Sequence, residues 1–99
     1  MELINAALNG DLPLIRELLN QGIDIHTNND QALITAADDG HLVVVEELLK
    51  QGANIHAQRD QALVSAAASG RIAVVQELLN NGADIQAPQV TFMLKMTRL

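Results

Sequence analysis

The feature that most constrains this chain is a sequence that repeats every thirty residues. Asp30-Gln31-Ala32-Leu33 recurs as Asp60-Gln61-Ala62-Leu63, and just over half of the residues in 30–59 are identical to those in 60–89. Residues 1–29 hold a more divergent copy, with its alanine pair and glycines in the same register. A fixed period of this length is the signature of a solenoid, in which each unit packs on its neighbours. We therefore predict a single domain, residues 1–99, with repeats at about 1–29, 30–59 and 60–89.

Within each repeat the apolar spacing predicts two helices joined by a turn. Asp30 and Asp60 are expected to be N-caps, whose carboxylates accept the free amides of short helices over 32–39 and 62–69. Gly40 and Gly70 are expected to end those helices in a left-handed conformation. A second helix follows, with apolar residues three and four apart, as at Leu42, Val45, Leu48 and Leu49. The predicted fold class is all-α, a helix-turn-helix solenoid of about three stacked repeats.

The composition supports close packing of helices and excludes several functions. Hydrophobic residues make up 48% of the chain, whereas aromatic residues make up 1%, so small aliphatic side chains must form the core. A chain with Phe92 as its one aromatic residue lacks the stacking platforms of single-stranded nucleic-acid readers. The absence of cysteine excludes a disulfide scaffold, a zinc finger and a cysteine nucleophile.

The net charge of −6 argues against nucleic acid and membrane partners, because an acidic surface repels phosphates. All twelve acidic residues lie in 1–89, which hold only four basic residues: Arg16, Lys50, Arg59 and Arg71. No signal peptide and no apolar stretch of bilayer length is visible in the sequence. These observations favour a cytoplasmic protein.

The stretch from Gly40 to Ile55 (GHLVVVEELLKQGANI) resembles the outer helix and following turn of the ankyrin repeat family. The match extends over residues 3–89. The period is 30 rather than about 33 residues, and the family's Thr-Pro-Leu-His is replaced by Gln31-Ala32-Leu33-Ile34. Since only four residues separate Ile55 from Asp60, we expect blunt loops in place of β-hairpin fingers. Short repeats with an Ile-His-Ala-Gln turn are similar to those of large amoebal viruses and amoeba-associated microbes, which would place the protein in the host cytosol.

The resemblance implies a non-catalytic protein-protein interaction module that binds a partner protein through its concave face. The implied contact positions precede the first glycine of each repeat or lie in the turn between repeats: Leu8, Asn9, Asn28, Asn29, Asp38, Asp39, Gln58, Arg59, Ser69 and the neighbouring Ala68. They vary between copies, which also fits residues that are merely solvated. Asp38 and Asp39 favour a partner with a basic or amide-rich patch.

No cofactor, metal or catalytic site is predicted. His26 and His56 occupy the same repeat position, so they are expected roughly 8–10 Å apart as exposed turn residues, too far to share one zinc ion. His41 follows Gly40, but no nucleophile accompanies it, and its position is explained by the start of a helix. We find no catalytic triad, phosphate loop or metal-ligand spacing.

Residues 90–99 leave three alternatives open, because six of the ten are apolar and two are basic. The segment can form a degenerate first helix of a fourth repeat that caps the stack, mediate self-association, or be disordered. The alternative function is accordingly architectural: self-assembly, or one end of a longer ankyrin solenoid.

Overall fold

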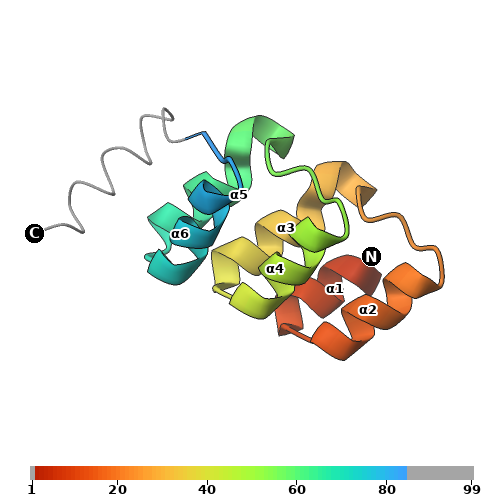
Figure 1. The fold of residues 1–99 in the computed structure, drawn as a ribbon. Helices are drawn as coiled ribbons and strands as arrows, with labels where there is room; N and C mark the ends of the chain where they lie inside the picture. Colours follow the sequence, from red (N-terminus) through yellow and green to blue (C-terminus); the bar gives the residue numbers. More distant parts are fainter. Residues whose placement is uncertain (1, 85–99) are drawn as a thin grey trace, which may run out of the picture.

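The computed structural model describes residues 2–84, which form six α-helices in two layers (Figure 1). The inner layer, as we call it, contains α1, α3 and α5, with α3 packed between the other two; the outer layer contains α2, α4 and α6, with α4 in the middle. The helices are α1 (Glu2–Asn9), α2 (Leu12–Asn20), α3 (Thr27–Asp39), α4 (Leu42–Lys50), α5 (Ala57–Ala68) and α6 (Ile72–Asn80). The predicted all-α solenoid of about three repeats is confirmed.

The ends of the helices follow the sequence signals in most places. At the start of α2, Asp11 Oδ1 accepts a hydrogen bond from the backbone N–H of Leu14 at 3.2 Å, and Pro13 lies in the first turn, where its missing N–H costs nothing. At the end of α3, Gly40 has a φ of 77°, as predicted for a left-handed C-cap. No strand occurs between residues 2 and 84, so the turns there carry no β-hairpin, as expected from their length.

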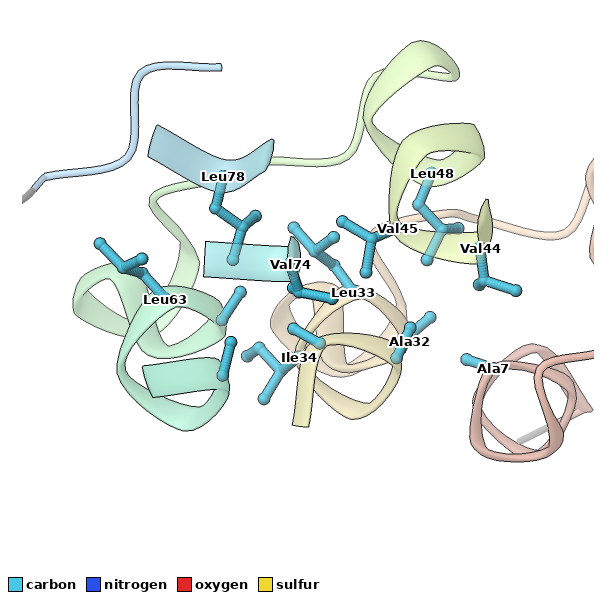
Figure 2. Packing of buried hydrophobic residues seen from close by; sticks show 14 of the residues in the cluster. Ala7, Ala32, Leu33, Ile34, Val44, Val45, Leu48, Leu63, Val74 and Leu78 are labelled. Carbon is cyan, nitrogen blue, oxygen red and sulfur yellow. The ribbon is translucent and has the colours of Figure 1, made fainter. Parts of the chain in front are cut away.

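Within residues 2–84, aliphatic side chains form the core between the two layers. The three alanine pairs, Ala6-Ala7, Ala36-Ala37 and Ala66-Ala67, are at most 5% exposed, and these small side chains allow adjacent inner helices to approach closely. Leu33, Val45, Leu48 and Val74 gather between the layers (Figure 2) and are no more than 1% exposed. Burying each large side chain stabilises the fold by about 1.5–3 kcal/mol.

The N-cap role predicted for Asp30 and Asp60 is wrong. Residues 28–30 and 58–60 all have positive φ values, so each trio forms a left-handed turn within α3 and α5, and the regular helix begins one residue later. The Asp30 carboxylate accepts a hydrogen bond from the backbone N–H of Asn54 at 2.8 Å and lies 2.9 Å from Nδ1 of His26. It makes no hydrogen bond to the amides of its own helix within the part of the chain described here.

Asp60 repeats this arrangement thirty residues later. Its carboxylate accepts from the backbone N–H of Asp84 at 2.8 Å and lies 3.0 Å from Nδ1 of His56. Asp30 and Asp60 are only 4% and 8% exposed, and a buried carboxylate is stable only with such partners. Each aspartate therefore fastens the turn before its helix to the turn that ends the same repeat. The segment 90–99, predicted as a cap, a self-association surface or a disordered end, lies outside the described residues.

Candidate partner-binding surface

The predicted contact residues form two rows at opposite ends of the inner helices. The row at the C-terminal ends contains Leu8, Asn9, Asp38, Asp39 and Ser69, and the row at the N-terminal ends contains Asn28, Asn29, Gln58 and Arg59. All are exposed except Asp39, which is half-buried. The regular part of α3 between the rows runs from Gln31 to Asp39, about 12 Å at 1.5 Å per residue. The structure therefore brings the residues together within each row and separates the two rows.

The left-handed turns shape the N-terminal row. Asn28, Asn29, Gln58 and Arg59 all have φ values between 54° and 60°. The Gln58 side-chain amide donates to the backbone carbonyl of Asn29 at 3.1 Å, so consecutive turns are tied to each other. The Arg59 guanidinium makes no hydrogen bond or ion pair with any described residue. In this row the Arg59 guanidinium is therefore available to a partner, and its turn is held in place by the contacts between repeats.

The C-terminal row is partly occupied by contacts between repeats. Ser69 Oγ donates to Asp38 Oδ1 at 2.8 Å, and Arg71 Nε donates to the backbone carbonyl of Asp38 at 3.0 Å. The side chains of Asn9 and Asp39 make no hydrogen bond or ion pair within residues 2–84. Of the two aspartates that favoured a basic partner, Asp39 thus has the freer carboxylate.

A polar stripe that the sequence interpretation missed connects the two rows. Along α3, Gln31 Nε2 donates to Thr35 Oγ1 at 3.1 Å, and along α5, Gln61 Nε2 donates to Ser65 Oγ at 2.8 Å. All four side chains are half-buried on the same side of their helices, one turn apart. The signal in the sequence was a polar residue at four-residue spacing inside an otherwise apolar helix. We use the name inner face for this stripe together with the two rows.

The three histidines have structural partners. His41 Nε2 lies 2.9 Å from the backbone carbonyl of Leu8, at the C-terminal end of α1, and its side chain makes no cap at the start of its own helix. His41 thus stands at the start of α4, as expected, but its ring closes the junction with the preceding repeat. His26 and His56 are exposed turn residues, as predicted, and each contacts a buried aspartate. No group of three His, Cys, Asp or Glu side chains suited to a metal ion occurs in the described part of the chain.

Glu47 is the buried acid of the outer layer, with a side chain that is 8% exposed. Its carboxylate accepts from Gln51 Nε2 at 2.8 Å and from Arg16 Nε at 3.2 Å. The hydrogen bond from Gln51, together with the contact and charge of Arg16, lowers the pKa of Glu47 below its ordinary value, although burial acts in the opposite direction. Glu47 therefore stays ionised and fastens α2 to α4.

A sequence model described as ankyrin repeats, in three copies, matches residues 3–89. No curated protein matches this sequence. Among residues 2–84, no helix combines the length and the apolar character needed to cross a bilayer.

Proposed function

Because the chain belongs to the ankyrin repeat family, whose members generally mediate protein–protein interaction, we propose that it binds a partner protein through the inner face and catalyses no reaction of its own. The observation that carries the proposal is a contrast between two sets of positions. Core positions repeat the same aliphatic types, whereas Asn9, Asp39 and Ser69, at one position of successive repeats, differ in chemistry and reach solvent. A solenoid can vary such residues without disturbing its core.

The charges of the inner face favour a partner that offers amide and basic groups beside Asp39 and an acidic group beside Arg59. The two residues lie on different rows, so one partner must span the length of an inner helix to contact both. Opposite charges placed in this way increase the association rate and fix the orientation of a complex more than they increase its affinity.

The test is affinity capture from the native cell, followed by mass spectrometry, with the unmodified chain and two variants. Asn9→Lys with Asp39→Lys places two cations at the C-terminal ends of α1 and α3, where the helix dipole tolerates them. Asp38 is left unchanged because Ser69 depends on it. We expect this variant to lose the partners of the unmodified chain while its circular dichroism is unchanged.

Glu17→Lys is the matched control, since Glu17 is an exposed acid of the outer layer. It should retain the partners. If the inner-face variant and the control capture the same proteins as the unmodified chain, the inner face is not the binding surface.

Self-assembly is the second candidate, and one exposed apolar residue of the third repeat favours it. Ile72, at the start of α6, is 44% exposed, whereas Leu12 and Leu42 at the same repeat position are half-buried. Sedimentation velocity over a range of concentrations separates the two functions. A mass that rises with concentration, and falls back to the monomer in Ile72→Ser, would support assembly; a constant monomer mass would remove it.

A further inference from the structure

The outer layer carries an open groove that the inner-face proposal does not use. The groove has a volume of about 470 Å³ and crosses α4 obliquely, from the start of α2 to the end of α6. Leu12, Val43 and Leu49 supply its apolar lining, and Val43 is 56% exposed. The carboxylates of Glu46 and Glu77 lie in the same groove, beside the junction between the second and third repeats.

At the junction between the first and second repeats, the acidic residue that corresponds to Glu77 is neutralised by an arginine. Arg16 of α2 reaches across to Glu47 of α4, with its terminal guanidinium nitrogen 3.2 Å from Oε1. The other carboxylate oxygen, Oε2, accepts a hydrogen bond from Gln51, one turn further along α4. One oxygen is thus held by an amide of the same helix, and the other receives a guanidinium from the preceding repeat.

Thirty residues later the same acceptor is present and the guanidinium is missing. Glu77 stands in the position of Glu47, and Asn81, in the position of Gln51, donates to Glu77 Oε2 at 2.8 Å. The position of Arg16 is taken by Glu46, which is exposed. Glu77 Oε1 and the Glu46 carboxylate have no hydrogen-bond or ion-pair partner within residues 2–84. The second junction therefore places two glutamates along the groove, whereas the first junction pairs an acid with a base.

None of the cations within residues 2–84 fills this site. Arg16 is bound to Glu47, and Arg71 donates to the backbone carbonyl of Asp38. Lys50 lines the groove but makes no ion pair with Glu46 or Glu77. A guanidinium suits two neighbouring carboxylates better than an ammonium does, because its planar group donates several hydrogen bonds in fixed directions.

We propose that this groove binds an arginine side chain of another protein, which places its guanidinium at Glu77 Oε1 and Glu46 as Arg16 does at Glu47. The aliphatic stem of the arginine and an adjacent apolar residue of the partner cover Val43. The occupant is a short segment with an arginine next to an apolar residue. This surface is distinct from the inner face, so the chain can contact partners on both layers.

The experiment compares two capped peptides, acetyl-Leu-Arg-Leu-amide and the same peptide with citrulline in place of arginine, which is similar in shape and uncharged. Binding to the full chain is measured by titration while amide NMR spectra are recorded. We expect the arginine peptide to bind about tenfold or more tightly than the citrulline peptide, as a charge-assisted contact to a half-buried carboxylate requires. The amide signals that shift should belong to 43–50 and 77–81.

Three variants make the test specific. Glu77→Gln keeps an acceptor for Asn81 but removes the charge, and the tenfold preference should vanish. Glu46→Arg supplies the missing guanidinium from the chain itself, so it should raise the thermal midpoint and abolish peptide binding. Glu17 occupies the repeat position of Glu77 in the first repeat and is exposed. Glu17→Gln should therefore leave the preference for arginine and the thermal midpoint unaltered.

Equal binding of the two peptides, or a preference that survives Glu77→Gln, would overturn the proposal. If Glu17→Gln reduced the preference for the arginine peptide as much as Glu77→Gln, the proposal would also be overturned, because general charge attraction would then explain the binding. Signal shifts confined to the inner layer would assign the peptide to the other face. Self-association that depends on Glu77 would show that a second copy, and not another protein, supplies the arginine.

Discussion

At the residue scale, the two buried aspartates Asp30 and Asp60 decide how consecutive turns are connected. Asp30→Ala leaves the N–H of Asn54 without its 2.8 Å acceptor and His26 without its carboxylate. A hydrogen bond to a charged group contributes about 1.5–3 kcal/mol, and we expect the free energy of unfolding to fall by up to that amount in urea denaturation. Asp30→Asn keeps an acceptor oxygen, so its free energy of unfolding should fall by less. A change of only a few tenths of a kcal/mol in Asp30→Ala would contradict the role assigned to this carboxylate.

The left-handed turns give a second prediction at this scale. Asn29 and Arg59 occupy the same repeat position with φ values of 57° and 60°, but asparagine tolerates this conformation and arginine does not. Arg59→Gly should therefore raise the free energy of unfolding by about 0.5–1 kcal/mol, since the strain relieved exceeds the added chain entropy. Asn29→Gly is the matched control and should change it little. Equal effects of the two substitutions would show that Arg59 is not strained.

These aspartates also show where sequence reasoning stopped. An acid just before an apolar helical period is a typical N-cap, and spacing alone gave no reason to expect three consecutive left-handed residues in front of the helix. The turn became visible only with the backbone, because neither Gln58 nor Arg59 is a residue type that signals a positive φ. The contacts of His26 and His56 with those carboxylates follow from the same turn.

At the scale of elements, the ends of α1 and α3 are each closed by a side chain from the next repeat. A methyl group added at Gly10 would lie 2.6 Å from Nδ1 of His41, which closes α1, whereas one added at Gly70, at the same position of the third repeat, would meet nothing within 4 Å. Gly10 and Gly70 have φ values of 68° and 72°, so Gly10→Ala and Gly70→Ala share the backbone penalty. Gly10→Ala should cost about 1–3 kcal/mol more, as overpacking does. Similar thermal midpoints for the two variants would contradict a tight junction.

The junction between α2 and α4 predicts a dependence of stability on pH. The folded state lowers the pKa of Glu47 from its ordinary value of 4.5, so this group stabilises the fold above that pH. The contribution is lost as the pH falls through the lower, folded-state pKa. Glu47→Gln should therefore lose stability at neutral pH and show a flatter decline between about pH 5 and 3 than the unmodified chain. Parallel curves would contradict the ionised Arg16–Glu47 contact; Glu17→Gln, at an exposed site, is the control.

The start of α2 and the end of α3 were predictable because their signals are local, whereas the starts of α3 and α5 were not. Gly40, Pro13 and Asp11 lie where their conformational preferences place them, and the alanine pairs are buried as their recurrence indicated. The polar stripe was harder to predict from the sequence. Gln31 and Thr35 lie within an apolar helix, and only the packing of α3 between α1 and α5 shows which side of it remains open.

For the whole molecule, the thirty-residue period was sufficient to predict the architecture, because each repeat must bury its apolar side against an equivalent neighbour. The binding surface is less determined. Exposed positions such as Asn9 and Arg59 can vary without disturbing the core, so the fold does not determine their chemistry. The outer groove illustrates the same point: the difference between Arg16 and Glu46 has no effect on the fold class but changes what the second junction can bind.

The central claim, that the inner face is the partner-binding surface, is tested most directly by hydrogen–deuterium exchange of the chain with and without its captured partner. Amides that a partner covers, or whose local opening it suppresses, exchange more slowly. The account predicts that protection gained on binding is concentrated in segments 5–9, 28–39 and 58–69, which contain both rows and the polar stripe. Protection confined to α2, α4 and α6, with the inner helices unchanged, would contradict it.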